Sequence, residues 1–167
     1  MRRPLSLTLV LVGLLLVGCG GSGSSTTTGG STTTTRATAN DRAAYIARAD
    51  ALCKSANVRQ EALRAHAKGL PVTKLVPILH QQATIAQSLA TALGRLTPPV
   101  GDFATVGRFV HAVHQLSVYS VAVANSIHAN HAFAARALAG KLVAARQQET
   151  LLGQGYGYKV CSSGKSY

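Results

Sequence analysis

Apolar residues recur at intervals of three, four and seven positions from residue 41 to residue 152, which is the periodicity of amphipathic helices. This pattern predicts four helices, over about residues 41–68, 75–96, 102–128 and 133–152. Gly69 and Pro71 end the first, and Thr97-Pro98-Pro99 ends the second. The predicted core positions are Tyr45, Ala49, Leu52, Ala56 and Leu63 in the first helix, Leu75, Leu79, Gln82, Ala86, Leu89, Leu93 and Leu96 in the second, Phe103, Val106, Val110, Val113, Ser117, Ser120, Ala124 and Ile127 in the third, and Phe133, Leu138, Leu142, Ala145 and Leu152 in the fourth.

Short connections between such helices favour an all-α fold, an antiparallel four-helix bundle with up-down-up-down topology over residues 40–152. Asn40 or Asp41 is a suitable N-cap for the first helix, and Asp102 for the third. Pro77 requires that the second helix either begins there or is kinked. The stretch 118–124 is rich in β-branched residues, but helical periodicity continues on both sides and we assign it to the third helix. The glycines that follow predict a non-helical C-terminal tail, residues 153–167.

The first 39 residues have a different composition. Met1-Arg2-Arg3 is followed by an apolar run over residues 5–18, which is the layout of an export signal. The run is shorter than the ~20 residues that a membrane-spanning helix needs, so a permanent transmembrane helix is not expected. Residues 20–39 are mostly Gly, Ser, Thr and Ala and contain no large apolar side chain, which predicts a flexible tether.

The apolar run ends in Leu16-Val17-Gly18-Cys19, which resembles a lipobox, the sequence at which bacterial lipoprotein precursors are lipidated and cleaved. The resemblance implies that residues 1–18 are removed as a signal peptide. Cys19 then carries acyl chains such as palmitate, which anchor the protein on the outer face of the cytoplasmic membrane. The alternative is an ordinary signal peptide cleaved near Gly18, which leaves Cys19 as a free thiol.

Two further cysteines remain in the mature chain, Cys53 and Cys161. An even pair of cysteines in an oxidising compartment predicts a disulfide, which would fasten the C-terminal tail to the first helix. The alternative is a pair of unpaired buried thiols.

Three segments resemble a pattern of small helical lipoproteins and secreted proteins of high-GC Gram-positive bacteria. They are Tyr45–Cys53 (YIARADALC), Leu96–Pro99 (LTPP) and Tyr156–Cys161 (YGYKVC). The resemblance covers most of residues 41–163. It implies a helical fold and the cysteine pair, and it implies no activity.

The chain is basic, with 17 Lys and Arg, 5 Asp and Glu, and a formal net charge of +12. Removal of the signal takes Arg2 and Arg3 with it and leaves a net charge of about +10. The basic residues are spread along the chain and aromatic residues are scarce, which argues against nucleic-acid recognition through a basic patch with stacking platforms. The membrane itself, anionic lipid headgroups and acidic wall polymers are the partners we expect.

Catalysis by paired carboxylates has few candidate residues, namely Asp41, Asp50, Glu61, Asp102 and Glu149. Asp41 and Asp102 stand at predicted helix starts, where capping of the helix explains them. We expect the other three carboxylates to be solvated. The chain has no nucleophile-elbow, P-loop or dinucleotide-binding motif. The sequence therefore predicts a non-catalytic module for interaction, scaffolding or sensing that uses no cofactor. An enzyme of an unrecognised type ranks last.

Histidines offer a second hypothesis. His111 and His114 are three residues apart and share one helix face, and an antiparallel pairing brings His80 close to their level. Together they form a candidate site for a metal ion or haem, although no carboxylate nearby in sequence supports them. The alternative is three surface histidines. Tyr156 and Tyr158 are either a binding strip or, as we expect, a cover over the disulfide and one end of the bundle.

Overall fold

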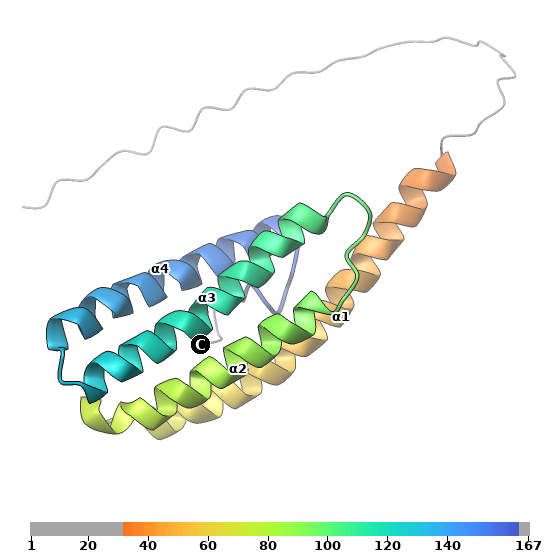
Figure 1. The fold of residues 1–167 in the computed structure, drawn as a ribbon. Helices are drawn as coiled ribbons and strands as arrows, with labels where there is room; N and C mark the ends of the chain where they lie inside the picture. The colour runs from red at the N-terminus through yellow and green to blue at the C-terminus, as the bar shows by residue number, and fades with distance from the viewer. Residues whose placement is uncertain (1–31, 164–167) are drawn as a thin grey trace, which may run out of the picture. The chain divides into compact units, whose positions relative to one another are not determined.

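The computed structural model describes the backbone of residues 32–163 and the side chains of residues 41–163. This part of the chain contains four α-helices and a short 3-10 helix, η1 (Val72–Leu75) (Figure 1). The α-helices are α1 (Thr32–Ala67), α2 (Val76–Gly94), α3 (Phe103–His128) and α4 (Ala132–Tyr156). Consecutive helices pack along each other, α1 on α2, α2 on α3 and α3 on α4. The prediction of an all-α, up-down-up-down four-helix bundle is confirmed.

Helix α1 begins at Thr32, nine residues before the predicted start at Asp41. Asn40 and Asp41 therefore lie inside the helix, and the prediction that one of them is its N-cap is wrong. A Gly/Ser/Thr-rich composition excludes a hydrophobic core, but it does not prevent an existing helix from growing by one hydrogen bond per residue. The last eight residues of the predicted tether are thus helical. The predicted signal peptide, Cys19 and the rest of the predicted tether lie outside the described residues.

Helix α2 resolves the alternative that Pro77 posed, because the helix starts at Val76 and the proline occupies its first turn. Proline suits this position because the N–H that it lacks would have no partner within the helix. Residues 118–124 are helical as predicted. At Pro77 and in residues 118–124, the helix assignment made from the local sequence therefore agrees with the structure.

Helix α4 passes through Gly153 to Tyr156, so the prediction that helix stops at residue 152 is wrong. A glycine inside a helix costs about 1 kcal/mol relative to alanine. Here it allows close packing, because a Cβ atom at position 153 would lie 3.1 Å from Ser162 Cβ and 3.3 Å from Phe109 Cε2. The helix ends at Gly157, whose φ of 99° is left-handed, with Tyr158 N–H donating to Gly153 O at 3.0 Å.

Of the 25 predicted core positions, 12 are buried and 11 are half-buried, and the two that are exposed are both phenylalanines. Phe103 is 57% exposed and Phe133 is 89% exposed, and Phe109 fills the core of α3 instead. Both exposed rings belong to the first two residues of their helices, at the ends of the bundle, where no facing helix covers them. The main cluster of buried residues is Tyr45, Ala49, Cys53, Ala56, Ile85, Leu89, Ala90, Leu93, Val106, Phe109, Val113, Tyr156, Tyr158 and Cys161.

Candidate functional site

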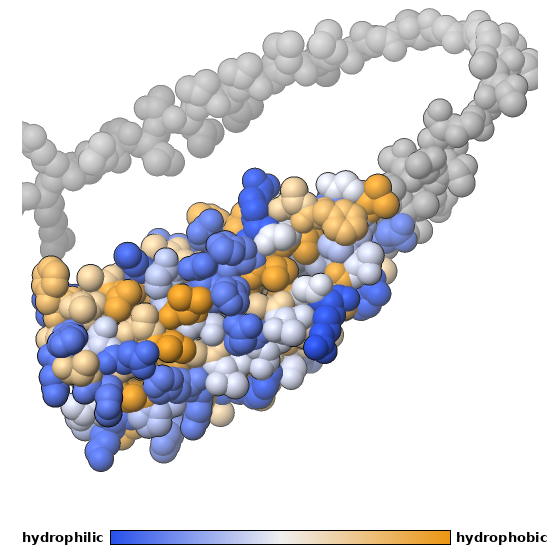
Figure 2. Space-filling model, in the orientation of Figure 1, coloured by the Kyte–Doolittle hydropathy of each residue, from blue (hydrophilic) through white to orange (hydrophobic). Residues whose placement is uncertain are grey.

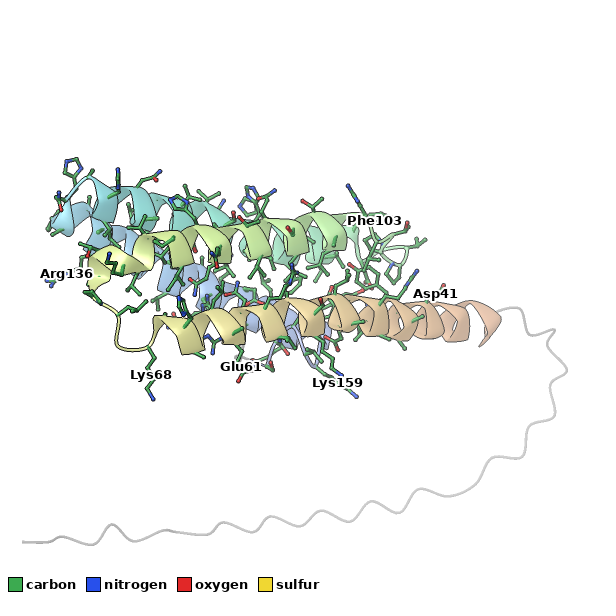
Figure 3. All side chains as sticks on the ribbon, turned by 90° about the horizontal axis from the view of Figure 1, so that it is seen from below. Asp41, Glu61, Lys68, Phe103, Arg136 and Lys159 are labelled. Atoms are coloured by element: carbon green, nitrogen blue, oxygen red, sulfur yellow. A yellow bond between two sulfur atoms is a disulfide. The ribbon has the colours of Figure 1, made fainter. Side chains whose placement is uncertain are left out.

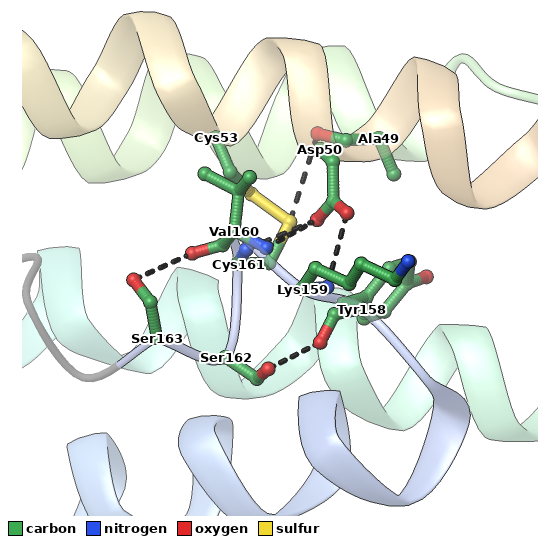
Figure 4. The surroundings of a disulfide bond; sticks show 9 residues. All are labelled: Ala49, Asp50, Cys53, Tyr158, Lys159, Val160, Cys161, Ser162 and Ser163. Carbon is green, nitrogen blue, oxygen red and sulfur yellow. Dashed lines mark hydrogen bonds between the residues drawn. A yellow bond between two sulfur atoms is a disulfide. The ribbon is translucent and has the colours of Figure 1, made fainter.

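The C-terminal segment is bonded to α1 by the predicted disulfide between Cys53 and Cys161 (Figure 4). Their Cα atoms are 5.1 Å apart, and both residues are buried in the main core cluster. The alternative of two unpaired thiols is therefore wrong. The bond closes a loop of 108 residues that contains three of the four α-helices of the described chain.

Asp50, one turn before Cys53 on α1, binds the same segment through its carboxylate. Its two oxygens accept hydrogen bonds from the backbone N–H groups of Lys159, Val160 and Cys161, at 3.0, 3.0 and 3.1 Å (Figure 4). Successive backbone N–H groups that converge on one anion form an anion-binding concavity, and here the anion is a side chain of the protein. The expectation that Asp50 is solvated is wrong, because this carboxylate holds the C-terminal segment on α1.

Asp102 joins three parts of the chain. Asp102 occupies the N-cap position of α3 as predicted, but its side chain makes no capping hydrogen bond, so the expectation that its carboxylate caps the helix is wrong. It accepts hydrogen bonds from Arg42 Nε at 2.8 Å, from Arg42 Nη2 at 2.5 Å and from the hydroxyl of Tyr156 at 2.7 Å. The Arg42 guanidinium lowers the pKa of the Asp102 carboxyl below its usual value. The contact links the first part of α1, the start of α3 and the end of α4.

The aromatic residues of the C-terminal segment lie inside the bundle. Tyr156 and Tyr158 are 7% and 3% exposed, and their ring centroids are 4.9 Å apart. Tyr158 also packs on Phe109 at 4.7 Å and on Tyr45 at 6.4 Å. Burial raises the pKa of Tyr158. These rings cover the core next to the disulfide as predicted, and their burial is inconsistent with the alternative of an exposed binding strip.

Glu149 is the third acidic residue whose surroundings differ from the prediction. It was expected to be solvated, yet it is 2% exposed on the face of α4 that also buries Ala145 and Gly153. Burial raises the pKa of its carboxyl group to about 8, so the group is largely protonated at neutral pH. Its Oε1 atom has no hydrogen-bond partner among the described residues. The remaining acids of the chain, Asp41 and Glu61, are exposed on α1.

The three candidate metal-binding histidines are not assembled into a site. His80 and His111 are exposed and His114 is half-buried. Within residues 32–163, no three His, Cys, Asp or Glu side chains are grouped so that they could hold a metal ion. Two histidines three apart need a third ligand from a facing helix, and α2 presents His80 to solvent instead. His111 lines a polar groove between α3 and α4 together with Gln115, Tyr119, Lys141, Ala144, Ala145 and Gln148.

An apolar groove of about 480 Å³ lies at the end of the bundle where η1, the end of α3 and the start of α4 meet. Figure 2 shows apolar side chains exposed among polar ones at this end of the molecule. Three of the four residues that α4 contributes to the groove are alanines, at positions 132, 135 and 139, and their small side chains leave space opposite the larger side chains of α3. Its lining residues are Val72, Thr73, Val123, Ile127, Asn130, Ala132, Ala135, Arg136 and Ala139.

Sequence reasoning missed this groove. The signal for it is a run of alanines spaced three and four apart in the first turns of α4, beside Arg136. We instead expected Phe133 to mark the core side of this helix, but that residue is exposed and does not line the groove.

No protein-family model, curated protein or solved structure matches the chain. Among the helices of the described residues, none is long and apolar enough to cross a membrane.

Proposed function

We propose that the protein is a lipid-anchored, non-catalytic helical binding module on the outer face of the cytoplasmic membrane. The observation that carries the proposal is the sequence Leu16-Val17-Gly18-Cys19 at the end of an N-terminal apolar run. A lipidated Cys19 would hold the bundle at the membrane surface, since two or more acyl chains anchor a protein stably where one does not.

The disulfide supports a location outside the cytoplasm. Cys53 and Cys161 are bonded and buried, and such bonds persist in oxidising compartments. The acidic residues support binding rather than acid–base chemistry. Asp50 and Asp102 are occupied by hydrogen bonds within the fold, and Glu149 is enclosed in the bundle interior. A catalytic carboxylate must instead reach the proton that it transfers.

The anchor is tested by the intact mass of protein extracted from native membranes. We expect a chain that begins at Cys19 and carries added acyl mass, and a Cys19→Ser variant that lacks this mass and leaves the membrane fraction. A Ser22→Ala variant in the same tether should behave as the wild type. A wild-type chain recovered in soluble form without acyl mass would contradict the proposal.

The location is tested on intact cells with an amine reagent that does not cross membranes. Lys68 and Lys74 are exposed at the end of the bundle, so both should be modified before the cells are lysed. Modification only after lysis would place the domain in the cytoplasm and contradict the proposed location.

A further inference from the structure

The apolar groove differs from the rest of the surface in chemistry as well as in shape. Val72 from η1, Val123 and Ile127 from α3 and three alanines from α4 form its walls and floor. Its volume of about 480 Å³ falls in the range of roughly 300–1,000 Å³ that small-molecule sites occupy, and such sites are mostly apolar with a few polar groups. The groove therefore has the size and lining of a site for one apolar molecule.

Positive charge surrounds this groove. Arg136 is its one charged lining residue, is exposed, and makes no ion pair within the described residues. Lys74 and His128 line an adjoining groove that shares Thr73, Ile127 and Asn130 with it. The chain has no Asp or Glu in residues 62–101 or 103–148, which include every element at this end. Figure 3 shows Arg136 and Lys68 at this end of the bundle, and Asp41 at the other. An anionic group at the groove thus meets cations and no carboxylate.

We propose that this groove binds a single-chain anionic amphiphile, such as a long-chain carboxylate. Its acyl chain lies against Val123, Ile127 and the alanines of α4, and its anionic head contacts Arg136. A protein partner fits the groove less well, because specific protein interfaces bury about 800 Å² on each side and this recess accepts only a small group. The inference deepens the proposed binding function and rests on it, but the groove itself does not depend on lipidation of Cys19.

Two other occupants are possible at this end and are separated by the experiment. Phe133 and Val72 are 89% and 60% exposed, so they could insert into an anionic bilayer. A second copy of the chain could also cover the groove. The recessed lining favours a single chain over a bilayer, because Phe133, the most exposed apolar side chain here, does not line the groove.

The binding experiment is calorimetry on the mature chain, residues 19–167, carrying Cys19→Ser so that no attached lipid competes. The probes are decanoate, dodecanoate and tetradecanoate below their micelle concentrations. Burial of two further methylenes is expected to tighten binding about 15-fold at each step until the groove is full. Dodecyltrimethylammonium has a positive head and an alkyl chain one carbon longer than that of dodecanoate, and it should nevertheless bind at least about tenfold more weakly than dodecanoate.

Three variants test the assignment of the groove. Ala135→Phe fills the apolar recess and should abolish saturable binding. Arg136→Gln should weaken dodecanoate about tenfold, since it removes a charged hydrogen-bond donor. Arg108→Gln removes an exposed arginine elsewhere on α3 that does not line the groove, and should leave binding unchanged. Circular dichroism and melting of each variant establish that it is folded.

Absence of saturable binding, affinity that does not change with chain length, or full affinity in Ala135→Phe would each overturn the proposal. Binding to anionic phosphatidylglycerol vesicles without binding to monomeric carboxylate would replace it with membrane contact through Phe133. Concentration-dependent dimerisation that Ala135→Phe abolishes, without carboxylate binding, would replace it with self-association. The mass measurement on Cys19 is separate, so failure of the anchor and failure of the groove are distinguishable.

Discussion

Replacement of Glu149 by Gln should stabilise the protein in a strongly pH-dependent way. Burial raises the pKa of this carboxyl from 4.5 to about 8. Between these two values the unfolded chain releases the proton and the folded chain keeps it, so the wild type loses stability as pH rises from 4.5 to 8. One pKa unit corresponds to 1.36 kcal/mol, and the loss should reach about 3 kcal/mol at pH 7 and about 4 kcal/mol at pH 8, where half of the folded molecules have also released the proton. The Glu149→Gln variant has no titrating proton at this position and should not show this loss of stability.

The assay is urea unfolding of the oxidised protein at pH 4.5, 7 and 8, followed by far-UV circular dichroism. The two proteins should differ by less than about 1 kcal/mol at pH 4.5, because glutamine has nearly the shape of a protonated glutamate. The difference in unfolding free energy between variant and wild type should then grow with pH. The contributions of other titrating groups are the same in both proteins and cancel in this difference. Glu61→Gln, a change at an exposed position of α1, should remain within about 0.5 kcal/mol of the wild type throughout. A Glu149→Gln curve parallel to the wild type at all three values would refute the reasoning.

Asp102→Asn should lower the free energy of unfolding by about 1 kcal/mol at pH 7, a modest value because Arg42 is exposed, and urea denaturation measures it. Because the pKa of Asp102 lies below its ordinary value of 3.8, its contribution should be lost as pH falls below 3.8 and through the lowered pKa, so the stabilities of variant and wild type should converge in acid. Replacement of Cys53 and Cys161 by serine should cost about 4.7 kcal/mol in the chain-entropy model, seen as a lower melting temperature. Gly153→Ala should destabilise by about 1–3 kcal/mol through contact with its neighbours, whereas Gly140→Ala, with open space around it, should stabilise by about 0.5–1 kcal/mol. Equal effects of the two alanines in thermal melts would contradict this packing argument.

The helices and about half of the main core cluster could be predicted from the sequence because their signal is local. Periodic apolar positions located all four α-helices, and Pro77 limited the start of α2. Errors occurred at helix ends, where composition and propensity decide little. Helix α1 begins nine residues before the start that the apolar periodicity indicated, and Gly153 continues α4 because of contacts that only the folded chain makes.

The roles of the acidic residues could not be predicted, because each depends on groups distant in sequence. Asp102 is 60 residues from Arg42 and 54 from Tyr156 in the hydrogen bonds that occupy it. Asp50 is more than 100 residues from the N–H groups that it binds, with a separation of 109 for the first. Periodicity indicates which face of a helix is buried, but it does not identify a partner on another helix. A carboxylate therefore resembles a solvated or capping residue until the fold is known.

The same contacts explain how a bundle with few large core residues is closed. Helices α1 and α4 pack less closely than consecutive helices do, although Tyr45 of α1 meets Tyr156 of α4 edge to face. The buried face of α4 consists of Ala145, Glu149, Gly153 and Tyr156. Such a face buries little apolar area, and apolar burial is the main stabilising contribution in most bundles. The C-terminal segment supplies what this face lacks, since it adds the Tyr158 ring to the core and is held on α1 by a disulfide and by Asp50. The cysteine pair is therefore part of the packing of the bundle, because it fixes the segment that joins its first and last helices.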